Sequence, residues 1–166
     1  ISAGATLELT GNITVSGDWS NSGTFTPSTN TVTFDGGVAQ SLTSGGSSFY
    51  DLSTATASTN LTIQDALVVS NDLTIAASTT LDAGSDQAIS VGGDWDNSGT
   101  FTSASNTVTF NGSGAQTVTT GGVGTGNDFN NVTITNSGAV DDASDVQTSG
   151  AIKVNGTHGR KCNHYL

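Results

Sequence analysis

The feature that most constrains the fold of this chain is an internal repeat with an offset of 76 residues. Positions 17–46 and 93–122 are identical at 20 of 30 places. The shared segments include Gly-Asp-Trp, Asn-Ser-Gly-Thr-Phe-Thr, Asn-Thr-Val-Thr-Phe, Ala-Gln and Gly-Gly. The offset widens to 80 between Phe49 and Phe129, so four residues are inserted near Gly124. Because self-similarity at a fixed period is the signature of a repeat architecture, the chain is predicted to hold two copies of a unit of 76 to 80 residues.

Within each unit, apolar residues alternate with polar ones over very short spans, as in Leu61-Thr62-Ile63 and Leu73-Thr74-Ile75. Each span predicts a strand of three to five residues with its apolar side chains on one face. Gly, Asn, Asp and Ser separate the spans, as tight turns require. The strands follow one another every six to eight residues, so three of them make a coil of about 20 residues.

This pattern predicts an all-β chain folded as a right-handed parallel β-solenoid of about eight short coils. Sandwich and meander folds normally use strands of five or six residues, and they remain as an alternative in the form of two tandem β-sandwich repeats. In the solenoid, residues 76 apart are expected to occupy equivalent coil positions. The residues expected to point inward are Ile13, Val15, Phe25, Val32, Phe34, Leu61, Ile63, Leu73, Ile75, Ile89, Val91, Phe101, Val108 and Phe110.

The domain organisation is predicted to be one solenoid over residues 1–157 and an atypical polar tail over 158–166. The repeat pattern is already under way at Ile1, which suggests a fragment or a mature segment of something longer. Cys162 is the single cysteine, so no internal disulfide is expected and stability must come from packing and backbone hydrogen bonds.

Charge narrows the range of partners. The formal net charge is −11, and the three basic residues Lys153, Arg160 and Lys161 all lie in the last 14 positions. A phosphate-binding surface needs clustered cations, so nucleic acid is not expected as a partner. An anionic membrane surface is disfavoured for the same reason, and no apolar run approaches the roughly 20 residues of a membrane span, so no membrane insertion is expected.

The repeated pattern resembles repeats in large bacterial cell-surface and secreted proteins of the adhesin-like parallel β-helix type. The pattern is Gly-Asp-Trp-x-Asn-Ser-Gly-Thr-Phe-Thr, then Asn-Thr-Val-Thr-Phe-x-Gly, then Ala-Gln, at 17–40 and again at 93–116. The resemblance covers nearly the whole chain except the tail. It implies a β-helical architecture and an extracellular location, secreted or on the cell surface. It supplies no catalytic residues.

Two kinds of residue suggest ligands. Trp19 and Trp95 are candidate aromatic platforms for stacking on surface glycans, and a tryptophan filling a solenoid corner explains them equally well. The aspartates at turns raise a weak expectation of Ca²⁺, which needs six to eight converging oxygens, whereas an Asp bonding its own backbone is the default interpretation. These aspartates are Asp18, Asp82, Asp86, Asp94, Asp96, Asp141, Asp142 and Asp145.

No catalytic constellation is recognisable, so the chain is predicted not to be an enzyme. It has no Gly-x-Ser-x-Gly elbow, phosphate loop or His-Glu-x-x-His pattern. His158, Cys162 and His164 sit in the short polar tail, where three ligands do not make a preformed metal site. No cofactor and no metal is therefore expected.

The threonine pattern suggests an alternative function. Thr-x-Thr pairs with an apolar middle residue recur, and if that residue points inward both threonines point out. Stacked on one flat face, such pairs resemble the arrays of ice-binding β-solenoids. The candidate residues are Thr31, Thr33, Thr107, Thr109, Thr117, Thr119, Thr133 and Thr135.

The sequence therefore favours a non-catalytic extracellular structural or adhesive repeat module of a larger bacterial surface or secreted protein. Its expected partners are neighbouring repeats or further copies stacked end to end, because solenoid ends expose unpaired strand edges. An ice-binding, antifreeze-type solenoid is the alternative.

Overall fold

The computed structural model describes residues 1–55, 58–122, 124, 126–142 and 152–154. Over these residues the chain is all-β and contains no helix. Each strand pairing between them is parallel. The predicted parallel β-solenoid is thus confirmed, and the alternative of two tandem β-sandwich repeats is wrong.

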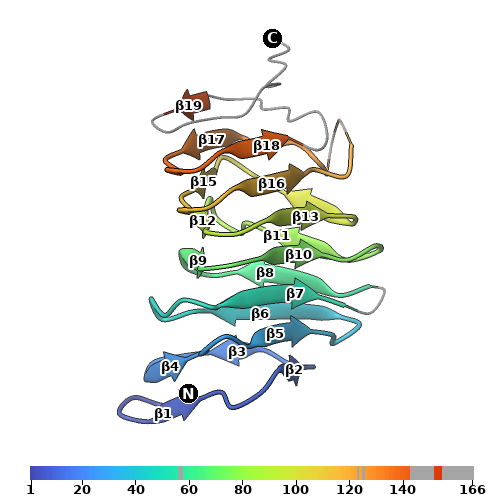
Figure 1. Ribbon diagram of the computed structural model, residues 1–166. Helices are drawn as coiled ribbons and strands as arrows, with labels where there is room; N and C mark the ends of the chain where they lie inside the picture. The colour runs from blue at the N-terminus through green and yellow to red at the C-terminus, as the bar shows by residue number, and fades with distance from the viewer. Residues whose placement is uncertain (56–57, 123, 125, 143–151, 155–166) are drawn as a thin grey trace.

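The strands stack from the N-terminal end to the C-terminal end along three faces (Figure 1). Face 1 begins with the pair β1–β4 and continues, after a single bridge from Phe49 to Val69, with β9, β12, β15, β17 and β19. Face 2 runs β2, β5, β7, β10, β13, β16, β18, and face 3 runs β3, β6, β8, β11, β14.

The bounds of the strands are as follows. Face 1 holds β1 (Thr6–Glu8), β4 (Thr24–Thr26), β9 (Leu67–Val69), β12 (Ile89–Val91), β15 (Thr107–Phe110), β17 (Asn131–Ile134) and β19 (Ile152–Val154). Face 2 holds β2 (Ile13–Val15), β5 (Thr31–Phe34), β7 (Asp51–Thr54), β10 (Leu73–Ile75), β13 (Trp95–Asn97), β16 (Gln116–Thr119) and β18 (Val140–Asp142). Face 3 holds β3 (Trp19–Ser20), β6 (Ala39–Thr43), β8 (Asn60–Ile63), β11 (Thr80–Asp82) and β14 (Thr100–Thr102).

The described residues make about six turns, and the expected count of eight is not confirmed. The tail predicted at 158–166 lies outside the described residues, together with His158, Cys162 and His164.

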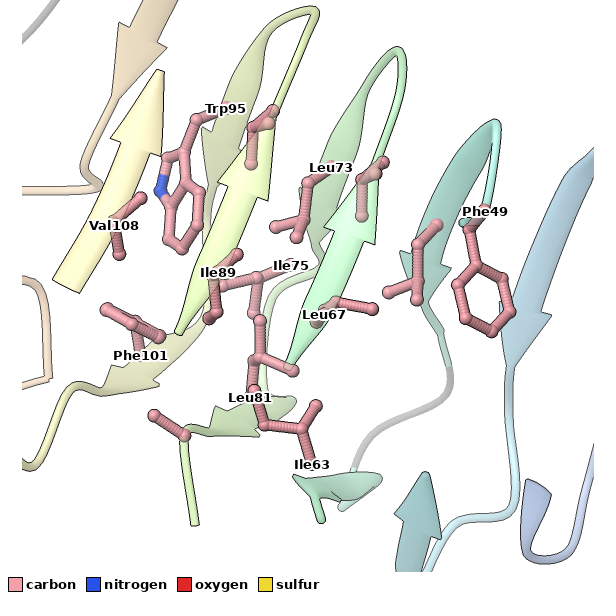
Figure 2. Packing of buried hydrophobic residues seen from close by; sticks show 14 of the residues in the cluster. Phe49, Ile63, Leu67, Leu73, Ile75, Leu81, Ile89, Trp95, Phe101 and Val108 are labelled. Atoms are coloured by element: carbon pink, nitrogen blue, oxygen red, sulfur yellow. The ribbon is translucent and has the colours of Figure 1, made fainter. Parts of the chain in front are cut away.

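The core is a single column of side chains enclosed by the three faces (Figure 2). Twelve of the fourteen residues predicted to point inward are buried, and Ile13 and Val15 are partly buried against the same cluster. Figure 2 shows Leu67, Leu73 and Leu81, one from each face of the same turn, directed into this column. The alternation of apolar and polar residues therefore predicts correctly which side chains point inward, with one or two residues per strand packing in the core.

The two copies of the repeat do not occupy the same faces. The strand that carries Trp19 lies on face 3, but its counterpart with Trp95 lies on face 2. Likewise Val32 lies on face 2 and Val108 on face 1, although both are fully buried. The expectation that residues 76 apart occupy equivalent coil positions is correct for burial and wrong for the face.

The reason for the rotation is the number of strands in one unit. β13 is the tenth strand after β3, and the bridge at Phe49 supplies one more strand position, so the step covers eleven positions. Three full turns of a three-faced solenoid use nine of these eleven positions. The remaining two positions move each element of the second copy two faces forward along the chain direction. On three faces this is the same as one face backward. The three faces are built alike, so the same segment folds on any of them.

The residues shared by the two copies form the corners. Asn97 Nδ2 donates to the carbonyl of Thr120 and its Oδ1 accepts the Gly99 amide; Asn21 makes the same bonds to Ser44 and Gly23. A Cβ on Gly99 would lie 2.4 Å from the Ala76 carbonyl oxygen of the coil below, and one on Gly23 the same distance from that of Ala5. These positions are glycine because backbone from the neighbouring coil occupies the space.

Candidate functional surfaces

Both tryptophans belong to the core. Trp95 is 1% exposed and Trp19 is 8% exposed. The Trp95 ring makes edge contacts with Phe101 and Phe129, at centroid distances of 4.9 and 5.1 Å, and Trp19 packs against Phe25 at 4.9 Å. Figure 2 shows the Trp95 side chain turned inward, near Val108 and Phe101. A buried ring offers no face to a sugar, so the solenoid-filling interpretation holds and carbohydrate stacking has no platform here.

The aromatic contacts explain why tryptophan follows the Gly-Asp turn in each copy. Three rings, Trp95, Phe101 and Phe129, come from successive parts of the chain and form one cluster, and Trp19, Phe25 and Phe49 form its counterpart in the first copy. Each aromatic ring buries a large apolar area and adds edge-to-face attraction. The two clusters stabilise the solenoid at two levels along its axis.

The eight threonines proposed for ice binding fall on two faces. Thr31, Thr33, Thr117 and Thr119 belong to β5 and β16 on face 2. Thr107, Thr109 and Thr133 belong to β15 and β17 on face 1, and Thr135 directly follows β17. Thr117 and Thr135 are exposed, and the other six are half-buried.

Acidic residues interrupt the threonines of face 2. The outward row that contains Thr33 continues through Ser53, Thr74 and Asp96 before it reaches Thr119. On face 1 the row continues from Ser90 through Thr109 to Thr133, below which stands exposed Val68. An ice-binding array needs a continuous threonine face, and neither face gives these eight residues one.

A ladder of carboxylates follows the corner that leads into face 2. Asp51 Oδ1 accepts the Asp72 amide at 3.1 Å, and Asp72 Oδ1 accepts the Asp94 amide at 2.8 Å. Asp94 Oδ1 then accepts the Thr117 amide at 2.7 Å. Each carboxylate thus accepts a hydrogen bond from a backbone N–H of the next coil, and not from its own turn as the default interpretation expected. The carboxylates are spread along the ladder and do not converge on one point as Ca²⁺ ligands do.

Asp18 plays the same part on the approach to face 3. Its Oδ1 accepts the Ser41 amide at 2.8 Å. That backbone hydrogen bond lowers the pKa of the Asp18 carboxyl, because it stabilises the charged form. Asp86 Oδ1 accepts the Ser105 amide in a similar way. Within the described part of the chain, no group of three or more His, Cys, Asp and Glu side chains is placed to hold a metal ion.

Face 3 carries hydroxyl-bearing residues that the sequence did not single out as a surface. Its outward positions include Thr62, Thr80, Thr100 and Thr102, in register with Asn60 and Asp82. Thr100-Phe101-Thr102 is a Thr-x-Thr pair, whereas Thr62 and Thr80 belong to no such pair on their own coils. Only the strand register, once known, brings them together.

Among the described residues, shallow hollows lie at two places on the surface. One lies between β9 and the segment after β15 and is lined by Val68, Ser70, Gly92, Asn111 and Ser113. The other lies beside β14 and is lined by Thr100, Thr102, Ser103, Gly126 and Asp128. The first is lined by no carboxylate and the second by one, so neither holds the carboxylate pair that glycoside hydrolysis uses.

Comparison with known protein families, with curated proteins and with solved structures gives no match for this chain. No helix among the described residues has the length and apolar character needed to cross a membrane.

Proposed function

We propose that this chain is a non-catalytic structural or adhesive repeat module of a larger surface or secreted protein, located outside the cell. The observation that carries the proposal is the structural role of the residues that the two copies share. Trp, Phe, Asn, Gln and Gly shared by the two copies all pack the core or close the corners, as Gln40 and Gln116 show: each donates from Nε2 to two carbonyls of the coil below.

The rotation of the second copy supports the same conclusion. A periodic ligand would need each copy to present its outward residues on one common face. Here the outward pair Thr31 and Thr33 lies on face 2, while its counterpart Thr107 and Thr109 lies on face 1. What repeats is therefore the set of residues that build coils, and such units serve as spacers or stalks whose length grows with the number of repeats.

The proposal also covers the hand and the length of the solenoid, of which about six turns are described. We expect right-handed winding, the hand that parallel strands joined by crossovers adopt, and about eight coils in the full chain. The body of the solenoid before Lys153 carries acids and no Lys or Arg, which favours a soluble, self-repelling shaft over nucleic-acid or membrane contact.

Ice binding stays as the second candidate because the row Ser90–Thr109–Thr133 on face 1 presents three stacked hydroxyls. It is disfavoured by the Val68 and the acidic interruptions described above.

The test is a pair of assays on the purified chain. Incubation with neutral and acidic polysaccharides should release no reducing ends, and nanolitre osmometry should show no thermal hysteresis. Release of reducing ends that Asp128→Asn abolishes would make the chain an enzyme. Thermal hysteresis that Thr109→Tyr abolishes would make it an ice binder, with Thr62→Tyr on face 3 as the matched control.

A further inference from the structure

The first nine residues repeat a later part of the chain. Ile1 to Leu9 align with Ile75 to Ala83 at an offset of 74, and Thr6-Leu7-Glu8 matches Thr80-Leu81-Asp82. The turn between them has the same backbone, since Gly4 and Ser78 both lie in the left-handed region, with φ of 78° and 63°. β1 is thus the counterpart of β11.

The hydrogen bonds confirm this alignment residue by residue. The Ser22 amide donates to the Ile1 carbonyl at 2.8 Å, and the Ser98 amide donates to the Ile75 carbonyl at 2.8 Å. The Ile1 nitrogen donates to the carbonyl of Ser20. Ile1 therefore occupies the place that Ile75 holds as the last residue of β10.

The later copy shows what lies below these strands. β11, β12 and β13 pair on their N-terminal side with β8, β9 and β10. Their counterparts β1, β2 and β3 pair on one side only with the strands the structure describes. We call the other side of β1, β2 and β3 the first-coil edge.

The difference in cover appears directly in the burial of matched residues. Leu81, Ile89 and Val91 are fully buried beneath β8 and β9. Their counterparts at the first-coil edge, Leu7, Ile13 and Val15, are only partly buried. The same apolar side chains thus face solvent in one copy and a parallel coil in the other.

A glycine supplies a second, independent sign. A Cβ on Gly93 would lie 2.3 Å from Asp72 Oδ1 and 2.7 Å from the Asn71 carbonyl carbon of the coil below. A Cβ on the matching Gly17 would meet no atom within 4 Å. The Gly93 amide also donates to the Asn71 carbonyl at 2.8 Å. Gly17 has the shape that a coil beneath it requires, although no described coil lies there.

We propose that the first-coil edge is a docking surface for one further parallel coil with the chemistry of residues 58–74, supplied by a neighbouring repeat and not by a second copy of this chain. The inference rests on the proposed function and adds the kind of partner that the solenoid stacks on. The occupant offers short strands with inward aliphatic residues, as Leu61, Leu67 and Leu73 are in β8, β9 and β10. It also offers a carbonyl at the position of Asn71, which accepts the Gly17 amide, and it buries Leu7, Ile13 and Val15.

The alignment of Ile1 with Ile75 shows where an added coil must be joined to test the proposal. A second copy of residues 58–74 is joined directly before Ile1, so that Ile1 completes a strand like β10. The amide of Gly17 should then exchange with solvent at least about tenfold more slowly, and the urea midpoint of unfolding should rise. Controls are an extension of equal length made of Gly and Ser, and the same coil with its copies of Ile63 and Leu67 replaced by Asp.

A cycle with Gly17→Ala sharpens the result. The substitution should leave the midpoint of the unextended chain unchanged and lower that of the extended chain. The proposal is overturned if the added coil behaves like the Gly-Ser extension, or if Gly17→Ala has the same effect in both backgrounds. It is also overturned if the Gly17 amide of the unextended chain becomes protected as protein concentration rises, since a second copy would then be the occupant. These outcomes are independent of the polysaccharide and ice assays.

Discussion

The first and second copies of the repeat share most of their sequence and differ in their surroundings. The segment with Trp19 and Phe25 lies near the first-coil edge on faces 3 and 1, whereas the segment with Trp95 and Phe101 lies mid-solenoid on faces 2 and 3. The corner hydrogen bonds of Asn21 and Asn97 are the same in both copies, and Trp19, Phe25, Trp95 and Phe101 are all buried. A repeat in a three-faced solenoid thus need not contain a whole number of turns, provided that each corner and each inward position is satisfied locally.

The two copies also show where the coil tolerates change. The second copy reaches Phe129 with four more residues than the first uses to reach Phe49, yet both side chains are fully buried. In the alignment the four additional residues fall near Gly124, between the matched pairs Gly46/Gly122 and Phe49/Phe129. The insertion therefore leaves the inward position of the phenylalanine that follows it unchanged.

The largest expected difference between the copies concerns tryptophan. Trp95→Ala should lower the free energy of unfolding by about 3–5 kcal/mol, since it empties a site enclosed by Phe101, Phe110 and Phe129. Trp19→Ala should cost less, because Trp19 is more exposed and packs against only Phe25 and Phe49 among the described rings. Urea unfolding followed by circular dichroism measures both. Equal losses would show that the two clusters are equally enclosed.

The buried glutamines should come next. Gln116→Ala should cost about 2–3 kcal/mol, because the carbonyl of Gly93 and the amide of Gly112 lose their Gln116 partner, and the carbonyl of Val91 keeps only the amide of Asn111. Gln40→Ala should cost slightly less, since Gln116 also accepts a hydrogen bond from buried Asn136. The same unfolding experiment decides the order. Gln116→Glu serves as a control that keeps the shape and removes the donor.

Alanine substitutions at the matched glycines Gly17 and Gly93 should have different effects on stability in the two copies. Gly93→Ala should cost about 1–2 kcal/mol because its Cβ would overlap the backbone of Asn71. Gly17→Ala in the unextended chain should be near neutral, since its Cβ enters open space. Differential scanning calorimetry of the two variants is the check. A loss at Gly17 as large as that at Gly93 would contradict the account of the first-coil edge.

The smallest expected effect is on how the stability of the chain depends on pH. The Ser41 amide holds the pKa of Asp18 below its usual value, so this carboxylate contributes stability above about pH 4 and loses it as the pH falls through the folded-state pKa. Asp18→Asn keeps an oxygen that accepts the same amide but does not titrate. Unfolding midpoints between pH 2 and pH 7 should therefore fall less with acid in Asp18→Asn than in the parent chain. Parallel curves would contradict the assignment.

The sequence predicts much of the fold and little of the surface. Alternating spans such as Leu61-Thr62-Ile63 predict which side chains point inward, because a period of two depends only on local backbone. The face of each strand depends on the sum of all preceding strands and corners. The bridge at Phe49 is a single position that no local pattern announces, and it adds one of the eleven strand positions that separate Thr107 and Thr109 from Thr31 and Thr33.

The surroundings of the candidate residues depend on long-range contacts in the same way. A short motif shows that Trp19 and Trp95 stand beside a turn, but their burial comes from phenylalanines far along the chain, such as Phe49 and Phe129. The threonine surface of face 3 was missed because Thr80 and Thr100 are neighbours only through the register of β11 and β14. Long-range register, not local pattern, decides what the surface presents.

The rotation of the second copy is the central claim, and a spin-label pair tests it directly. Thr74 and Asp96 are register partners on face 2, where neighbouring strands lie about 4.8 Å apart. Thr74→Cys with Asp96→Cys, in a Cys162→Ser background, should give strong dipolar broadening in continuous-wave electron paramagnetic resonance. Asp82→Cys with Asp96→Cys should give weak broadening, because Asp82 lies on face 3. Strong broadening for the pair at 82 and 96, with weak broadening for the pair at 74 and 96, would place Trp95 on the same face as Trp19 and contradict the account.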